Sequence, residues 1–284
     1  MLAFEELFPL PRVDKGKVSS LLVEGLRYEF LRFGIKRAVI GVSGGIDSAL
    51  ALALAKEALG SSQVHAYLLP FEASSPFSLE HGKTVCEKFS VPYEIIDITS
   101  MAKPYFESQA ISNQLRQGNV LARLRMIVLY DMAAKHGAFV VGTSNKTELL
   151  LGYSTLWGDM ASAVNPLGDL YKSQVRILAD YLGIPQEICQ KPPSADLWPG
   201  QSDEAELRIT YDFADRILYQ YIDLCRSREW ICNTLSDLKM PLEDARRIFQ
   251  LVRQSQFKRL MPTILKISQR TLGREFRFPR DWMS

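Results

Sequence analysis

Short apolar segments alternate with helix-forming segments over the first half of the chain, and this alternation restricts the possible folds more than any other feature. Residues 38–42 (AVIGV) are almost wholly apolar, which is typical of a parallel strand buried on both faces. Residues 46–59 are rich in Ala and Leu and are followed by Gly60, which is typical of a helix and its end. A buried strand, a glycine turn and a helix therefore follow one another directly.

The alternation continues downstream and predicts a sheet. Because crossover connections between parallel strands are right-handed, successive helices should cover both faces of that sheet. We therefore predict the α/β class, an open doubly wound parallel sheet with helices on both faces. The further expected elements are a helix at 21–33, a strand at 64–70, a helix at 79–89, a strand at 93–98, a helix at 120–135 and a strand at 138–142.

The C-terminal third differs from the rest of the chain. After a predicted helix at 173–182 and a proline-rich connection at 191–200 (KPPSADLWPG), the pattern is helical with little strand signal, and we find no internal repeat. We expect a single domain over residues 1–284, with an α/β core at 1–200 and a mainly helical extension at 201–284.

Charge and cysteine content exclude several classes of protein. The chain has 34 Lys and Arg against 32 Asp and Glu, scattered without a long basic run, so no nucleic-acid partner is expected. No segment reaches the roughly 18 apolar residues of a membrane span. The four cysteines form no C-x-x-C pair, which argues against a zinc site or a disulfide framework. We expect a cytoplasmic protein with small-molecule partners and no membrane association.

Two polar turns follow predicted strands, and ligands of such sheets bind at the carboxyl ends of the strands. The first turn is Ser43-Gly44-Gly45-Ile46-Asp47-Ser48 and the second is residues 143–148, so both should face one crevice. In the first turn, glycines allow close approach of an anion to the backbone, and a helix N-terminus offers unpaired N–H groups. This predicts a phosphate-binding loop. The alternative is an ordinary glycine turn in which Ser43 or Asp47 caps the helix.

The loop SGGIDS lacks the lysine of the G-x-x-x-x-G-K-[ST] motif, so the usual apparatus of γ-phosphoryl transfer is missing. It resembles instead the loop of the ATP pyrophosphatases, which split ATP between its α- and β-phosphates. Several families share that loop, so it indicates the reaction type and not the substrate.

Three further stretches resemble one of these families, the NAD+ synthetases, and they occur in the family's order. They are GNVLARLR at 118–125, GTSNKTE at 142–148, and PSADL at 193–197 with QSDE at 201–204. The absence of an additional domain indicates the ammonia-dependent form. The resemblance implies that ATP adenylates the nicotinate carboxylate of deamido-NAD+ and that ammonia then displaces AMP to give NAD+. It also implies a homodimer with deamido-NAD+ at the subunit interface.

The resemblance assigns residues to four sets. The ATP-binding residues are Gly41, Val42, Ser43, Gly44, Gly45, Ile46, Asp47, Ser48, Thr143, Lys172 and Ser194. The residues that contact deamido-NAD+ are Asn119, Arg123, Asp159 and Lys258. Mg2+ is expected on Asp47 and Glu148, and the catalytic residues are Asp47, Lys172 and Asp159.

These assignments are chemically reasonable. An arginine fork suits the anionic groups of deamido-NAD+, and Asn119 and Arg123 share a helix face from which Arg125 points away. The ammonium of Lys172 would neutralise departing pyrophosphate. Asp159 would attract ammonium and receive its proton. Mg2+ typically uses one or two protein carboxylates together with phosphate oxygens and water.

Structural roles remain as alternatives for these residues. Thr143 or Ser144 would cap the next helix, with Glu148 as an acid in its first turn. Arg123 would form a salt bridge or pack against a neighbouring helix, and Asp159 would bond to its own loop.

The sequence also departs from the family and leaves other functions open. Leu156 and Ala163 stand where several family members carry a basic residue and an acid, so part of the dinucleotide contact set is expected to differ. The rival functions are a tRNA-modifying ATP pyrophosphatase and a sensor that binds adenine nucleotides without chemistry.

Overall fold

The fold is built on a parallel sheet of four strands in the order β3-β2-β1-β4. The computed structural model describes residues 4–194, 196, 198, 200–260 and 262–271. In the register of the central strand, Ile40 lies beside Ala66 on one side and Val141 on the other. The strands are β1 (Arg37–Gly41), β2 (Val64–Leu68), β3 (Tyr93–Ile95) and β4 (Ala138–Val141).

The strand order places a switch point beside β1. The chain runs from β1 outward to β2 and β3 and then returns to the opposite side of β1 as β4. Connections therefore leave the carboxyl ends of β1 and β4 in opposite directions, which opens a crevice between them. The two polar turns that the sequence analysis places in one crevice follow these two strands.

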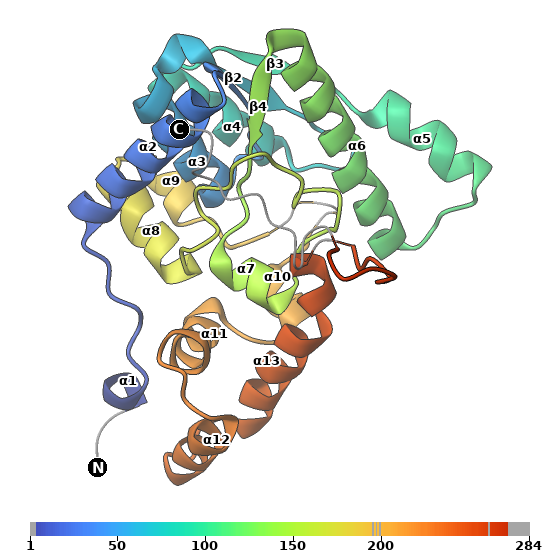
Figure 1. Ribbon diagram of the computed structural model, residues 1–284. Helices are drawn as coiled ribbons and strands as arrows, with labels where there is room; N and C mark the ends of the chain where they lie inside the picture. The colour runs from blue at the N-terminus through green and yellow to red at the C-terminus, as the bar shows by residue number, and fades with distance from the viewer. Residues whose placement is uncertain (1–3, 195, 197, 199, 261, 272–284) are drawn as a thin grey trace.

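Helices cover both faces of the sheet, as predicted. Alternate residues of a strand point to opposite faces, and in β1 the side chain of Ile40 packs into one apolar cluster while that of Val39 packs into another. Figure 1 shows α2, α3 and α8 on one side of the sheet and α6 on the other. The helices and helical turns up to the end of this α/β part are α1 (Phe4–Leu7), α2 (Lys15–Arg32), α3 (Ile46–Leu59), η1 (Ser61–Gln63), α4 (Pro76–Lys88), α5 (Thr99–Ser108), α6 (Gln114–His136), α7 (Lys146–Leu151), α8 (Lys172–Tyr181) and α9 (Gln186–Cys189).

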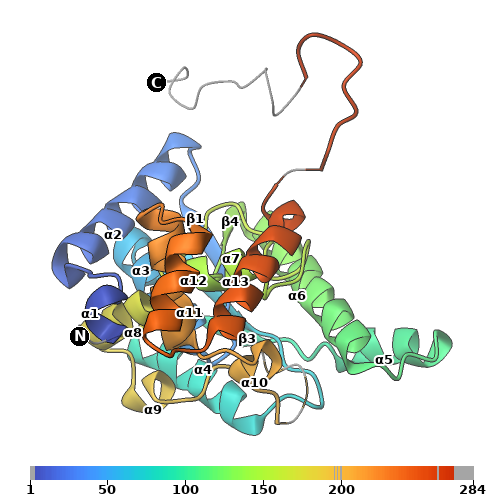
Figure 2. The ribbon, with the colours of Figure 1, turned by 90° about the horizontal axis from the view of Figure 1, so that it is seen from below.

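The remaining helices form a third apolar cluster of their own. This cluster also takes in Phe8, Leu151 and Tyr171, so it is continuous with the ends of α1 and α7 and with the start of α8. Figure 2 shows α11, α12 and α13 packed together close to α7 and α8. These elements are α10 (Asp203–Leu207), α11 (Tyr211–Leu218), the π-helical turn η2 (Tyr219–Asp223), α12 (Arg228–Asp237), α13 (Leu242–Gln254) and η3 (Gln256–Arg259).

The predicted elements exist, but several boundaries differ. Helix α6 begins before residue 120 because the Asn113 side chain accepts a hydrogen bond from Arg116 N and caps it, although the first turn is polar. Strand β3 ends at Ile95, yet the chain beyond it stays hydrogen-bonded to the residues that follow β2, since Ile98 N donates to Pro70 O. Helix α5 was not predicted. Among the described residues, no helix combines the length and the apolar character needed to cross a membrane.

Candidate functional site

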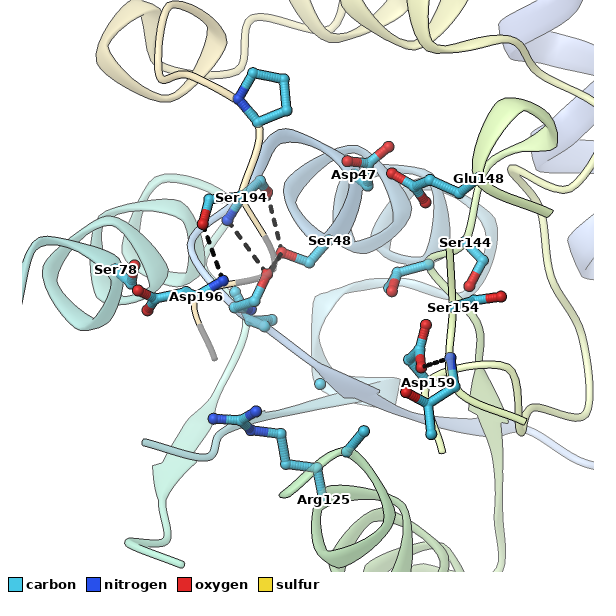
Figure 3. A pocket seen from close by; sticks show the side chains of 18 of the residues that line it. Asp47, Ser48, Ser78, Arg125, Ser144, Glu148, Ser154, Asp159, Ser194 and Asp196 are labelled. Atoms are coloured by element: carbon cyan, nitrogen blue, oxygen red, sulfur yellow. Dashed lines mark hydrogen bonds between the residues drawn. The ribbon is translucent and has the colours of Figure 1, made fainter. Parts of the chain in front are cut away.

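A cavity of about 750 Å³ opens at the carboxyl ends of β1 and β4 (Figure 3). A volume of this size is typical of small-molecule sites. The cavity receives side chains or backbone from the loop after β1, the first turns of α7 and α8, helix α6 and the connection before α10. The lining residues that the sequence analysis had singled out are Gly41, Val42, Ser43, Gly45, Ile46, Asp47, Ser48, Asn119, Thr143, Glu148, Asp159, Lys172, Ser194 and Lys258. Gly44 and Arg123 were also singled out, and they are not part of this lining.

Gly44 shapes the loop from behind. Its φ is +73°, in the left-handed region, and a Cβ on it would lie 2.1 Å from the backbone oxygen of Ser78 at the start of α4. Only glycine combines this conformation with so close an approach. The residue therefore fixes the loop against α4 while its neighbours face the cavity.

The serines of the loop hold the loop's own shape. Ser48 Oγ accepts from Ser43 N at 3.2 Å and donates to Gly45 O at 3.0 Å. Gly45 is the N-cap residue of α3 and, among the described residues, no side chain caps this helix. The first N–H groups of α3 are thus left for a ligand, and an anion is what they favour. The alternative was that Ser43 or Asp47 caps α3, and in the structure neither side chain does so.

Lys172 lies between two carboxylates at the meeting point of three helix N-termini. Its Nζ is 2.5 Å from Asp47 Oδ2 and 3.0 Å from Glu148 Oε1. The Lys172 side chain is 3% exposed, and those of Asp47 and Glu148 are 17% and 16% exposed. The three residues belong to α8, α3 and α7 respectively. The sequence analysis assigned all three to ATP or Mg2+, and the structure brings them into direct contact.

The charges in this cluster do not balance. Burial raises the pKa of Glu148 to about 7, against the lowering effect of Lys172 and with a further raising effect from Asp47. Burial alone would lower the pKa of Lys172, but Asp47 and Glu148 outweigh it and raise that pKa above its usual value. Two carboxylates face one ammonium, so the cluster favours an added positive charge when both carboxylates are ionised.

Asn145 completes the cluster, and the sequence analysis missed it. Its Nδ2 donates to Asp47 Oδ1 at 2.8 Å, and its Oδ1 accepts from Glu148 N at 3.0 Å. Glu148 Oε2 in turn accepts from Asn145 N at 3.2 Å, which makes a capping box at the start of α7. Asn145 followed three residues later by Glu148 is the sequence pattern of such a box and could have revealed it. The cap of α7 is therefore Asn145, and not Thr143 or Ser144.

Asp159 and Lys258 also line the cavity. Asp159 Oδ1 accepts from Thr155 N at 2.7 Å, as Figure 3 shows, so it does bond to its own loop while also lining the cavity. Lys258 Nζ donates to Gly152 O at 2.8 Å and to Ser154 O at 2.7 Å. Burial raises the pKa of Asp159 and lowers that of Lys258. Both shifts favour the neutral forms of the two side chains.

The two arginines of α6 lie differently from the expectation. Arg123 donates to Asn119 O and to Leu156 O, each at 3.0 Å, so its guanidinium joins α6 to the loop before Asp159. Arg125, expected to point away, lines the cavity, where its Nε donates to Leu69 O at 3.0 Å (Figure 3). Burial lowers the pKa of Arg125. The contact of Arg123 with substrate stays a prediction, and Arg125 is an additional candidate.

The connection before α10 closes the cavity near α4. Ser194 Oγ accepts from Asp196 N at 3.1 Å, and both carboxylate oxygens of Asp196 lie 3.2 Å from Ser75 N. Ser194 and Asp196 both line the cavity (Figure 3). Residues 195 and 197 of the PSADL motif lie outside the described residues.

A metal ion would have to use few protein ligands here. Among the described residues, no group of three or more His, Cys, Asp or Glu side chains is arranged to hold a metal. Asp47 and Glu148 supply two neighbouring carboxylates with excess negative charge. That set fits Mg2+ bound jointly to protein and phosphate, since such ions take one or two carboxylates.

The chain is similar to known proteins over most of its length. The model of the NAD synthase family matches residues 18–262. A protein of Chlorobium phaeovibrioides named NH(3)-dependent NAD(+) synthetase is 51% identical over 265 residues, which cover 93% of this chain and 94% of that protein. A protein of Fusobacterium nucleatum with the same name is 44% identical over 253 residues, which cover 89% and 96%.

Two solved structures are similar over nearly their whole length. The NMN synthetase of Francisella tularensis has a TM-score of 0.79 at 31% identity and covers 89% of this chain and 99% of that one. The NH3-dependent NAD synthetase of Campylobacter jejuni has a TM-score of 0.74 at 30% identity and covers 90% and 100%. Because the family model matches most of the chain and the relatives are covered nearly in full, the chain belongs to the NAD synthase family.

Proposed function

We propose that this protein is an ammonia-dependent NAD+ synthetase, a ligase that converts deamido-NAD+ to NAD+. The nicotinate carboxylate attacks the α-phosphorus of ATP, the bond to the bridging oxygen of the β-phosphate breaks, and pyrophosphate leaves. Ammonia then adds to the carbonyl carbon of the acyl adenylate, a proton is lost, and AMP departs. The observation that carries the proposal is the contact of Lys172 with Asp47 and Glu148 beside the uncapped start of α3.

The triphosphate is assigned to the loop at 43–48 and to the first turn of α3. Backbone N–H groups and the positive end of the helix favour phosphate oxygens there. Lys172 is close enough to this loop to neutralise the charge that develops on pyrophosphate, which is electrostatic stabilisation of the transition state. Thr143 and Ser194 line the same cavity and are proposed to contact ATP.

Mg2+ is proposed to bind at Asp47 and Glu148. The ion would supply positive charge between the phosphates of ATP, which weakens the bond to the leaving group. The protein's part is to present two carboxylates held by Asn145, so that they need no reorganisation when nucleotide arrives. Their excess negative charge over Lys172 supports this assignment.

Deamido-NAD+ is assigned to the part of the cavity near Asp159. Asn119, Asp159 and Lys258 line the cavity, and Arg123 holds the loop before Asp159 in place. The raised pKa of Asp159 makes its carboxylate a better proton acceptor. It is therefore suited to take the proton of an arriving ammonium. Arg125 adds a guanidinium that can meet an anionic group of either substrate.

The protein is further proposed to be a cytoplasmic homodimer. Exposed apolar side chains on α6, namely Leu115, Ile127 and Tyr130, support an interface with a second copy of the chain. All four cysteines are free thiols, including exposed Cys225, which supports a reducing compartment.

The experiment that tests the function is a product assay on purified protein. ATP, Mg2+ and ammonium are supplied with or without deamido-NAD+, and AMP, ADP, pyrophosphate and NAD+ are measured. We expect AMP, pyrophosphate and NAD+ in equal amounts, and only with deamido-NAD+ present. A nucleotide sensor would release no pyrophosphate, a tRNA-modifying enzyme would require RNA, and either result would overturn the proposal.

A mononucleotide substrate is tested in the same assay. The solved structure from Francisella tularensis, a NMN synthetase, is as similar to this chain as the NAD synthetase structure is. Nicotinate mononucleotide therefore replaces deamido-NAD+ in a parallel reaction. We expect deamido-NAD+ to give the larger kcat/KM, and the opposite order would assign the mononucleotide as substrate.

A further inference from the structure

Asp215 lies in the helical extension, yet its side chain reaches the base of the candidate site. The residue is on α11 and is 0% exposed. One carboxylate oxygen accepts from Thr147 Oγ1 at 2.5 Å, and the other accepts from Ser173 N at 2.7 Å. Thr147 precedes Glu148 on α7, and Ser173 follows Lys172 on α8. A single carboxylate thus joins the first turns of the two helices that carry the acid and the lysine.

A second contact closes this link onto Lys172 itself. Thr147 Oγ1, which donates to Asp215, accepts from Lys172 N at 2.9 Å. The side chain of Thr147 therefore connects Asp215 to the backbone of Lys172 through two hydrogen bonds. Because Lys172 is the first residue of α8, a shift of that turn would move its Nζ relative to Asp47 and Glu148.

Helix α11 also approaches the ammonium directly. Tyr211 lies four residues before Asp215, on the same face of the helix. Its buried ring centroid is 5.1 Å from Lys172 Nζ, within the range of a cation–π contact. Its hydroxyl donates to Asp203 Oδ2 at 3.2 Å, which fixes the position of the ring. Two residues of one helix face thus act on Lys172, one through the backbone and one at the charged end.

We propose that Asp215, supported by Tyr211, is a positioning residue that places Lys172 for the departure of pyrophosphate. This role rests on the function proposed above for Lys172. The helical extension then has a catalytic purpose in addition to its own apolar core. Asp215 is buried among donors, and a residue that merely filled space there would not need a carboxylate, because burying a charge is costly.

The consequence for kinetics is specific. Lys172 is proposed to act on charge that appears only in the transition state, so misplacing it should lower kcat more than it raises the KM of either substrate. A purely structural role of Asp215 would lower stability without this selective effect on kcat. The two roles are therefore separable by experiment.

The test compares Asp215→Ala with two control variants on the same helix. Asp212→Asn changes an acid whose side chain is 56% exposed and pairs with Arg216. Ile217→Ala truncates a fully buried residue of the extension's apolar cluster and provides a stability loss without a link to Lys172. All variants are assayed for pyrophosphate release at a temperature well below their unfolding midpoints.

We expect Asp215→Ala to lower kcat by about tenfold or more, with the KM of deamido-NAD+ changed less than about twofold. Both controls should keep kcat within about twofold of the parent, although Ile217→Ala unfolds at a lower temperature. Asp215→Asn keeps an acceptor for Ser173 N and should recover part of kcat. A folded Asp215→Ala protein with the kcat of the parent would overturn the proposal.

Two further variants keep the proposal testable if Asp215→Ala does not fold. Thr147→Val removes the hydroxyl between Asp215 and Lys172 N at similar volume, and it should lower kcat in the same selective way. In a Lys172→Ala background, Asp215→Asn should lower kcat by less than about twofold, because its effect passes through Lys172. An undiminished effect there would overturn the proposal. A parent enzyme that forms no AMP would instead refute the proposed function.

Discussion

Lys172 Nζ lies 2.5 Å from Asp47 Oδ2, although the two residues are 125 positions apart in the sequence. The contact joins the first turn of α8 to the first turn of α3, and Glu148 adds the first turn of α7. Three helix N-termini therefore converge beside the loop at 43–48. The positive ends of three helix dipoles favour the carboxylates at this point and also favour an incoming polyphosphate.

Lys172→Met tests whether this buried cation is needed for both stability and catalysis. The substitution gives an unbranched, uncharged side chain that is one atom shorter, and it leaves Asp47 and Glu148 without their partner. We expect a loss of about 3 kcal/mol in the free energy of unfolding, typical of breaking a buried ion pair, and a fall in kcat of about a hundredfold. Denaturant unfolding and steady-state kinetics measure the two effects. Adding Glu148→Gln should restore part of the stability but not kcat, and recovery of kcat would contradict the assignment.

Gly44→Ala should distort the loop at 43–48, which is proposed to bind phosphate. Gly45→Ala provides a matched control. The Cβ at residue 44 would meet a backbone oxygen at 2.1 Å with φ at +73°, whereas at residue 45 the nearest atom is Ser43 Oγ at 3.4 Å. We expect Gly44→Ala to be destabilised by more than about 2 kcal/mol and to lose ATP binding. Gly45→Ala should be the milder change in both measurements. Equal effects of the two changes in calorimetric titration with ATP would contradict the assigned roles.

The raised pKa of Glu148 predicts a pH dependence in the nucleotide-free enzyme. With a pKa of about 7, Glu148 becomes protonated as the pH falls below neutrality, so kcat/KM for ATP should decline there. Glu148→Gln should lower activity and remove this acid limb. An unchanged acid limb in the variant would assign the titration to another group.

The same shift predicts a dependence of stability on pH. The pKa of Glu148 is higher in the folded protein, about 7, than its ordinary value of 4.5, so the folded state binds the proton more tightly. Glu148 therefore favours folding most below pH 4.5, and this contribution is lost as the pH rises through 7. The Tm of the parent minus the Tm of Glu148→Gln should therefore fall as the pH rises. A value that increases with pH would contradict this prediction.

Alanine variants at the two arginines of α6 separate their roles. Arg125 lines the cavity, and Arg125→Ala should lower kcat/KM for ATP or for deamido-NAD+ by about tenfold or more. Arg123 holds Leu156 O and Asn119 O, so Arg123→Ala should mainly raise the KM of deamido-NAD+ as these backbone segments loosen. An Arg125→Ala enzyme with parental kinetics would show that this guanidinium serves only to hold Leu69 O.

The sequence was sufficient to predict the sheet and the crevice. Apolar strands such as residues 38–42 and the Ala-rich α3 are local patterns, and the right-handed crossover rule then places helices on both faces of the sheet. The convergence of Asp47, Glu148 and Lys172 on one cavity followed from strand-end turns and from the family resemblance. What remains a prediction is which substrate each of these side chains contacts.

The features that the sequence did not reveal depend on tertiary contacts. Arg125 was placed away from the site, but it lies on the face of α6 that lines the cavity, together with Ala122 and Met126, and its Nε bonds to Leu69 O. Asp215 carries no motif, and its link to Thr147 and Ser173 exists only because α11 packs on α7 and α8. Helix periodicity shows which residues share a face, and it does not show which face meets the cavity, because that depends on how α6 packs on the sheet.

Isotope tracing tests the central claim most directly. Deamido-NAD+ labelled with a heavy oxygen isotope in both oxygens of its nicotinate carboxylate is converted with ATP and ammonium, and the products are examined by mass spectrometry. If the carboxylate attacks the α-phosphorus of ATP in this cavity, each AMP carries one labelled oxygen and the NAD+ amide keeps the other. Unlabelled AMP, or ADP as the nucleotide product, would contradict adenylation of the substrate.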